Sequence, residues 1–131
     1  MILLDTHVIV WSAIEPRRLS HAARSALRRG RSGGGLAAAS ISLWEMALLF
    51  ARGRVQGSGT VEASIRRVLD TVGVVVRPIT PEIAALATQF PGDYPREPAD
   101  RLIGATALAE GAALVTSDER IRSSPLLKTI W

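Results

Sequence analysis

Short aliphatic runs alternate with helix-length segments along the whole chain, and this alternation limits the folds open to it. Continuous apolar runs of three to five residues are typical of parallel strands buried on both faces. Helices between such strands cover the two faces of the sheet. The order therefore predicts an α/β fold, a three-layer α/β/α sandwich around a central parallel sheet. The expected strands span 2–4, 36–40, 74–76, 113–116 and 127–130.

Capping residues and helix breakers place the helices between these runs. Ser20, Thr60 and Thr80 are expected N-caps, and Gly30 is expected to end the helix that Ser20 begins. The run 74–76 is interpreted as a fully buried strand. The expected helices span 6–14, 20–29, 42–51, 60–72, 81–90, 99–109 and 118–122.

Composition narrows the chemistry that the chain can carry. Its 131 residues suit one domain, 1–131, and 47% of them are hydrophobic, enough for a packed core. No cysteine is present, so a bound metal needs oxygen or histidine ligands. The net charge is +4, and Lys128 is the only lysine among 16 cationic residues. An arginine-rich surface favours nucleic acid, although a compositional habit explains it equally well.

The start of the chain indicates where the protein works. A carboxylate at Asp5 follows Met1 closely, with no basic segment before it, which is unlike a signal peptide. No uncharged apolar run approaches the ~18 residues of a membrane span. We therefore expect a soluble, cytoplasmic protein without membrane contact.

Carboxylates stand where several of the expected strands end. Asp5 and Asp118 follow the first and fourth strands, Glu45 lies just after the second, and Asp100 lies in the first turn of a helix. Each has a purely local explanation: Asp5 and Asp118 as N-caps, Ser42 with Glu45 as a capping box, and Asp100 as a complement to the helix dipole. The carboxyl ends of parallel strands share one edge of the sheet, however, so these residues are expected to meet there.

Such a cluster calls for a cation or for protonation. Two like charges about 4 Å apart repel by about 4 kcal/mol at an effective dielectric constant of about 20. Carboxylate oxygens suit a hard, partly hydrated ion such as Mg²⁺ or Mn²⁺. An acidic metal pocket in an arginine-rich domain is typical of phosphodiester chemistry.

Five segments, in their order along the chain, resemble the PIN-domain ribonucleases, and within them the VapC toxins of bacterial toxin–antitoxin pairs. The similarity runs from Ile2 to about Ile121, and its specificity lies in the ordered spacing. The segments are Leu4-Asp5-Thr6-His7 with Trp11, Ser42-Leu43-Trp44-Glu45 with Gly53-Arg54, Pro78-Ile79-Thr80, Pro98-Ala99-Asp100-Arg101-Leu102-Ile103-Gly104-Ala105-Thr106-Ala107, and Leu114-Val115-Thr116-Ser117-Asp118.

The resemblance implies a PIN-like fold and a metal-dependent endoribonuclease, usually a homodimer, that a cognate VapB-type antitoxin holds inactive. It implies that Asp5, Glu45, Asp100 and Asp118 are the catalytic, metal-binding quartet. It also matches Thr6 and Thr116 to hydroxyl positions beside the site, while helix initiation and a buried strand end explain them equally well. One departure is visible, because residues 94–97 read Tyr-Pro-Arg-Glu where many relatives have His and Asp. The role of Glu97 therefore stays open.

Other residues have a bland interpretation beside a functional one. His7 and His21 hint at a metal-free acid–base nuclease, yet nothing else supports one, and His21 is expected away from the acidic edge. Arg101 either orients an acid or pairs with one. Trp11 and Trp44 favour core or dimer packing over base stacking. Arg24, Arg28 and Arg31 share a helical face, which is interpreted as solvated rather than as an RNA-binding surface. The apolar residues 47–50 cover adjacent faces of a helix, which permits a surface for a partner.

The sequence thus predicts an endoribonuclease toxin, dependent on Mg²⁺ or Mn²⁺, that hydrolyses RNA with a metal-activated water. Two alternatives stay open. One is a non-catalytic module that binds RNA or a partner protein. The other is a Mg²⁺-dependent phosphatase or phospho-acceptor domain, although Asp5-Thr6-His7 lacks the second aspartate of an Asp-x-Asp pattern.

Overall fold

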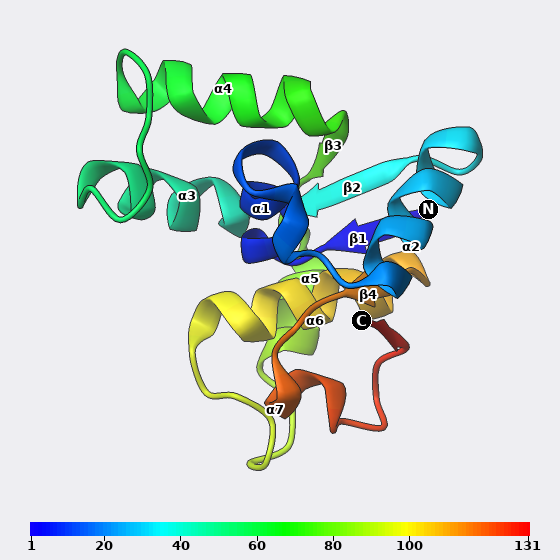
Figure 1. The fold of residues 1–131 in the computed structure, drawn as a ribbon. Helices are drawn as coiled ribbons and strands as arrows, with labels where there is room; N and C mark the ends of the chain where they lie inside the picture. The colour runs from blue at the N-terminus through cyan, green and yellow to red at the C-terminus, as the bar shows by residue number, and fades with distance from the viewer.

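The computed structural model describes residues 1–131, the whole chain, as a parallel sheet between two layers of helices (Figure 1). The strands lie in the order β3-β2-β1-β4-β5, and every hydrogen-bonded pair is parallel. The predicted central parallel sheet is confirmed. The strands are β1 (Ile2–Leu4), β2 (Leu36–Ala39), β3 (Val74–Arg77), β4 (Ala113–Val115) and β5 (Thr129–Ile130).

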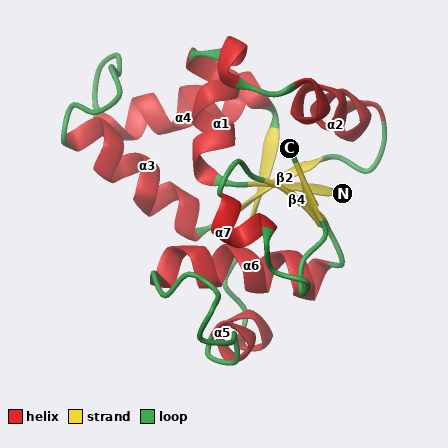
Figure 2. Cartoon of the chain, turned by 60° about the horizontal axis from the view of Figure 1, so that its bottom comes forward, coloured by secondary structure: helices red, strands yellow, loops and turns green.

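Two hydrophobic clusters, one on each face of the sheet, hold the layers together. Successive strand residues point to opposite faces, so Leu4 packs among residues of α1, α2, α3 and α4, while Leu3 packs among residues of α5, α6 and α7. Figure 2 shows the sheet between these two groups of helices. The helices are α1 (Thr6–Ile14), α2 (His21–Ser32), α3 (Ile41–Ala51), α4 (Val61–Val72), α5 (Pro81–Ala87), α6 (Pro98–Glu110) and α7 (Glu119–Arg122), with a 3₁₀ turn, η1, at Pro16–Arg18.

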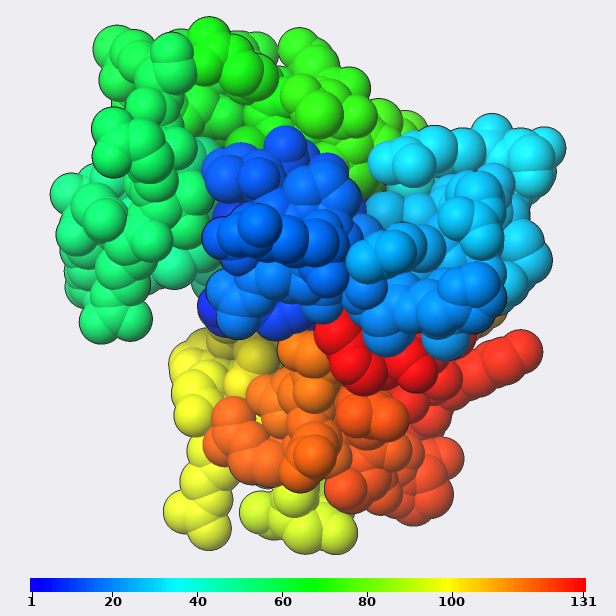
Figure 3. Space-filling model, in the orientation of Figure 1, coloured from blue at the N-terminus to red at the C-terminus, as the bar shows by residue number.

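The same division is visible on the surface. In the space-filling view of Figure 3 the chain from α1 to α4, blue to green, forms the upper part. The chain from α6 to the C-terminus, yellow to red, forms the lower part. None of the helices has both the length and the apolar character needed to cross a membrane.

The expected N-caps are confirmed. The hydroxyl oxygens of Ser20, Thr60 and Thr80 accept hydrogen bonds from backbone N–H groups three residues later, at 3.0, 3.0 and 3.2 Å. These bonds satisfy donors that the first turn of a helix leaves without partners. Local chemistry therefore fixes where α2, α4 and α5 begin.

Several expected boundaries are wrong. α2 continues through Gly30 to Ser32. Gly30 is buried against Leu36, and a β-carbon there would overlap that side chain, so close packing rather than a helix end accounts for this glycine. α5 ends at Ala87, three residues before Phe90. The last strand is also shorter than expected, with only Thr129 and Ile130 paired.

The third strand differs from its prediction in burial. β3 lies at the edge of the sheet, and Val75 is 62% exposed, whereas a fully buried strand was expected. An uninterrupted run of valines satisfies the pattern of a buried strand whether it is central or at the edge. The order of the strands, which the pattern does not contain, decides the exposure.

Candidate active site

The order of the strands creates a crevice between β1 and β4. The chain runs from β1 outward through β2 to β3, and then returns to the other side of β1 with β4. In parallel α/β sheets such a reversal opens a site beyond the carboxyl ends of the two strands. Asp5 follows β1 and Asp118 lies just after β4, so both flank this point.

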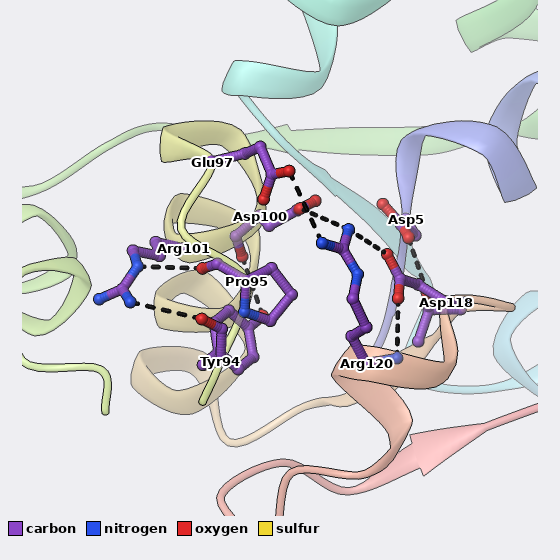
Figure 4. A network of polar contacts seen from close by, with 9 residues as sticks. Asp5, Tyr94, Pro95, Glu97, Asp100, Arg101, Asp118 and Arg120 are labelled. Carbon is purple, nitrogen blue, oxygen red and sulfur yellow. Dashed lines mark hydrogen bonds and ion pairs between the residues drawn. The ribbon is translucent and has the colours of Figure 1, made fainter. Parts of the chain in front are cut away.

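A pocket of about 420 Å³ opens at this reversal, and all four expected acidic residues line it. Glu97, whose role the sequence left open, adds a fifth carboxylate, and Arg120, which was not expected there, adds a positive charge. Figure 4 shows Asp5, Asp100, Asp118 and Glu97 around the side chain of Arg120. The lining residues are Asp5, His7, Trp11, Glu45, Glu97, Asp100, Ser117, Asp118 and Arg120.

Asp5 is held rigidly at the base of this pocket. Asp5 is only 8% exposed, and both of its carboxylate oxygens accept hydrogen bonds. The backbone N–H of Thr6 donates to Oδ1 at 2.8 Å, and the hydroxyl of Thr116 donates to Oδ2 at 2.7 Å. The local capping role expected for Asp5 is therefore present, and the bond from Thr116 additionally joins β4 to β1.

Glu45 is oriented by a chain of hydroxyl groups. The hydroxyl of Thr6 donates to Oε1 of Glu45, and it lies 2.8 Å from the hydroxyl oxygen of Ser42. A hydroxyl has one proton to donate, so Ser42 must donate to Thr6. The expected capping box is wrong: α3 begins at Ile41, Ser42 is fully buried within it, and Ser40 makes no side-chain cap.

Burial and mutual repulsion make Asp5, Glu45 and Asp100 costly to ionise. Burial raises the pKa of Asp5, and hydrogen bonds from Thr116 and Thr6 oppose that rise. Burial and the charge of Asp5 raise the pKa of Glu45. The pKa of Asp100 is raised to about 7, by burial first and then by the neighbouring carboxylates, foremost Asp5 and Glu45. The pocket therefore favours positive charge.

Arg101 neither orients nor pairs with an acid, unlike either expectation. Its guanidinium donates to the backbone oxygens of Phe90 and Pro95, each at 3.0 Å, and to that of Pro91 at 3.2 Å. The hydroxyl of Tyr94 in the same loop donates to the backbone oxygen of Asp100 at 2.9 Å. Figure 4 shows the contacts of Arg101 with the backbone oxygens of Pro95 and Tyr94, and the bond from Tyr94 to Asp100. The loop before α6 is thereby tied to the helix that carries Asp100.

Asp118 combines a local role with a place in the pocket. Its Oδ1 accepts from the backbone N–H of Arg120 at 2.9 Å, which caps α7 as expected. Its own N–H donates to the hydroxyl oxygen of Thr116 at 3.1 Å. Thr116 thus connects Asp118 to Asp5, and the two local hydrogen bonds leave the Asp118 side chain 27% exposed toward the pocket.

The oxygen atoms that line this pocket are of the kind that bind a hard divalent cation. The donors are carboxylate and hydroxyl oxygens, and the guanidinium of Arg120 already draws three of the carboxylates toward one positive charge. No three acidic or histidine side chains converge closely enough to form a ready-made metal cluster. The carboxylate oxygens of Asp5 and Glu45 instead accept hydrogen bonds from hydroxyl and backbone donors.

The remaining candidates lie in different places. His7 lines the pocket, whereas His21 begins α2 and does not. Trp11 is partly buried and lies beneath the guanidinium of Arg18, 4.3 Å from the ring centre. Trp44 is 61% exposed, so core packing is wrong for it. Arg31, expected beyond the helix, lies within α2.

Sequence reasoning missed Ser42 and Arg120 as neighbours of the acids. Ser42 was visible only as half of a capping motif, and that motif concealed its long-range bond to Thr6. Arg120 had no signal beyond its position two residues after Asp118. Both depend on which side chains meet across the sheet, which a linear pattern does not contain.

The fold and the pocket define a class: an α/β/α domain with an acidic crevice at the reversal of strand order. Residues 2–125 match the model of the PIN domain family. A relative, Ribonuclease VapC22 of Mycobacterium tuberculosis, is 42% identical over 132 residues, covering 99% of this chain and 98% of the relative. The chain therefore belongs to the PIN domain family, and the resemblance seen in its motifs is confirmed.

Solved structures agree on the fold. The crystal structure of VapBC2 from Rickettsia felis bound to a promoter DNA fragment contains a chain that superposes with a TM-score of 0.73 at 18% identity, covering 98% and 97% of the two chains. A chain of DNA-bound VapBC from Salmonella typhimurium superposes with a TM-score of 0.70 at 19% sequence identity, and the match covers 98% of this chain and 97% of that one. The PIN-like α/β/α sandwich is thereby confirmed.

Proposed function

We propose that this protein is an endoribonuclease of the VapC type, the toxin of a toxin–antitoxin pair. The observation that carries the proposal is the convergence of Asp5, Glu45, Asp100 and Asp118 on one pocket at the reversal of strand order. The 42% identity to a ribonuclease over nearly the full length of both chains supports the same activity.

We assign the four acids to a site for Mg²⁺ or Mn²⁺. Asp5 is the anchor because it is buried and fixed at both oxygens, and Asp100 and Asp118 face it across the pocket. A divalent cation bound there supplies charge neutralisation at the phosphate and activation of a water nucleophile. Its charge would also lower the pKa of Asp100, which burial raises first and the neighbouring carboxylates raise further, so that this carboxyl would ionise at neutral pH.

The hydroxyl groups keep the acids in place. Thr116 restrains Asp5 from the β4 side, and Thr6 restrains Glu45 while its backbone restrains Asp5. Neither threonine is needed as a proton donor to substrate in this scheme. Their contribution is orientation, which limits the carboxylate movement required when the site is loaded.

The partners follow from the proposed function. The structures that share the fold include DNA-bound VapBC from Rickettsia felis and Salmonella typhimurium and a toxin–antitoxin complex from Klebsiella pneumoniae. We therefore propose a VapB-type antitoxin as the inhibitor of this protein, a homodimer as its assembly, and RNA in the cytoplasm as its substrate.

The test is cleavage of RNA by two isosteric variants. Asp5→Asn and Asp100→Asn keep the shape of the pocket and remove one charge each, so cleavage should fall by about a hundredfold or more. Asp70→Asn, an exposed carboxylate on α4, is the matched control and should cleave normally. Excess EDTA should silence the wild type, and Mg²⁺ or Mn²⁺ should restore it.

The same variants separate the proposal from its main alternative. A module that only binds RNA or a partner would bind equally well after neutralisation of Asp5 and would show no cleavage at any metal concentration. Full cleavage by either pocket variant, or cleavage that EDTA leaves untouched, would contradict a metal-dependent nuclease at this site.

A further inference from the structure

One side chain already supplies positive charge to the acidic pocket. The guanidinium of Arg120 has its Nη2 3.4 Å from Oδ2 of Asp118 and 4.0 Å from Oδ2 of Asp100. Its Nη1 lies 3.7 Å from Oε1 of Glu97. Figure 4 shows this guanidinium between the three carboxylates, reaching in from α7 toward α6.

The contact is held loosely enough to be exchanged. The side chain of Arg120 is 60% exposed, and all its polar contacts in the pocket are to carboxylates, at distances of 3.4 to 4.0 Å. Exposed ion pairs of this kind are weak, because water competes with them and the long side chain loses freedom. The backbone of Arg120 is fixed separately through the cap from Asp118, so the side chain can leave without disturbing α7.

A divalent cation and this guanidinium compete for the same oxygens. Asp100 and Asp118 belong to the proposed metal site, and Oδ2 of each is the oxygen that contacts the guanidinium of Arg120. Two positive groups on these atoms would repel each other. Elsewhere in the pocket, both oxygens of Asp5 and Oε1 of Glu45 already accept hydrogen bonds. Binding of the metal therefore requires the guanidinium to withdraw.

We propose that Arg120 is the resident counter-cation of the metal-free pocket and that it exchanges with the divalent metal during loading. In the metal-free protein it gathers Asp100, Asp118 and Glu97 around one positive charge. In the loaded protein its side chain leaves these carboxylates for the rim of the pocket. The exchange rests on the proposed function, because it requires a metal site at these acids.

The first experiment measures metal binding rather than activity. Mn²⁺ is titrated calorimetrically into the wild type, Arg120→Gln and Arg122→Gln at fixed ionic strength. Arg122 is exposed on the same short helix and has the same charge, so its variant controls for a general loss of positive potential. Arg120→Gln should bind Mn²⁺ roughly fivefold more tightly than the other two proteins.

The second experiment follows the side chain itself. In the wild type, titration with diamagnetic Mg²⁺ should shift the Nε–Hε resonance of Arg120 toward that of a free arginine and leave the Arg122 resonance in place. Arg120→Lys retains a charge and should bind Mn²⁺ nearly as weakly as the wild type. Circular dichroism confirms that each variant is folded before it is titrated.

The outcomes separate the exchange from the proposed function. Equal Mn²⁺ affinity in the wild type and Arg120→Gln, or an Arg120 resonance that ignores Mg²⁺, overturns the exchange and leaves the metal-dependent nuclease standing. Weaker Mn²⁺ binding in Arg120→Gln also overturns it, because the arginine would then assist the metal. Absence of metal binding in every protein overturns both proposals.

Discussion

Thr6 connects two of the four acidic residues through two different groups. Its backbone N–H donates to Asp5, and its hydroxyl donates to Glu45 while accepting from Ser42. From the sequence, Thr6 was interpreted equally well as a helix start. Its link to Glu45, 39 positions away, depends on how α1 and α3 pack, and no local pattern contains that information.

Substitution of Thr6 tests this connection. Thr6→Val keeps the volume and removes the hydroxyl, so Glu45 loses the bond that lowers its pKa and Ser42 loses its partner. We expect cleavage to fall about tenfold, with its pH profile shifted to higher pH, and the free energy of unfolding to fall by about 1–2 kcal/mol. Thr6→Ser restores the hydroxyl and should restore both properties. Unchanged cleavage by the valine variant would contradict an orienting role.

Asp100 predicts how the stability of the metal-free protein depends on pH. Its pKa rises from about 3.8 to about 7 on folding, so the folded protein holds a proton that the unfolded chain releases between these values. The stabilisation that this proton gives is complete below about pH 4 and is lost as the pH rises through 7. Asp100→Asn has no carboxyl to ionise, so its stability does not fall in this way. In chelator at pH 8 its free energy of unfolding should exceed that of the wild type by about 1–3 kcal/mol.

Urea denaturation in chelator between pH 5 and pH 8 measures this difference. The gap between Asp100→Asn and the wild type should widen from pH 5 to about pH 7 and level off above it, while Asp70→Asn should follow the wild type throughout. If the free energies of unfolding of the wild type and Asp100→Asn changed in parallel with pH, the pocket would not raise the pKa of this carboxyl. Saturating Mg²⁺ should narrow the gap, because the cation stabilises the ionised acid.

At the scale of elements, the helix starts with a capping side chain were predictable, whereas helix contacts were not. Ser20 and Thr60 cap their helices through bonds within three residues, so the sequence alone locates those starts. Gly30 does not end α2. The side chain of Leu36 packs so closely against position 30 that only a glycine fits there. Arg101 likewise donates its hydrogen bonds to the loop before α6 and not to its neighbour Asp100.

Gly104 shows how closely α6 and this loop are packed. A β-carbon at position 104 would lie 2.6 Å from the hydroxyl of Tyr94 and 2.7 Å from the ring of Phe90. Gly104→Ala should therefore push the loop away, weaken the bond from Tyr94 to the backbone of Asp100, and cost about 1–3 kcal/mol of stability. Gly92→Ala, where a β-carbon meets nothing within 4 Å, is the control.

Thermal unfolding and RNA cleavage together evaluate the glycine variants. We expect Gly104→Ala to melt at a lower temperature and to cleave more slowly below its melting point, since the start of α6 carries Asp100. Gly92→Ala should match the wild type in both. A Gly104→Ala protein that is destabilised but fully active would mean that the loop supports the fold and not the position of Asp100.

At the scale of the whole molecule, the topology concentrates negative charge in one place. Five of the twelve acidic residues line the pocket, and only one of the sixteen cationic residues does. The remaining chain therefore carries fifteen cationic against seven acidic side chains. The sequence indicated that carboxylates share one edge of the sheet. It contained no information on the strand order that opens the crevice between β1 and β4.

This separation of charge predicts salt-dependent binding of RNA that is independent of cleavage. With Asp5→Asn in chelator, a single-stranded RNA oligonucleotide should bind more weakly as salt increases, because cationic side chains release counterions from the phosphates. For about three to five phosphate contacts the slope of log K against log salt is about −2 to −4. Fluorescence anisotropy between low and physiological salt measures it. A flat profile would show that the excess of arginine lies away from the RNA path.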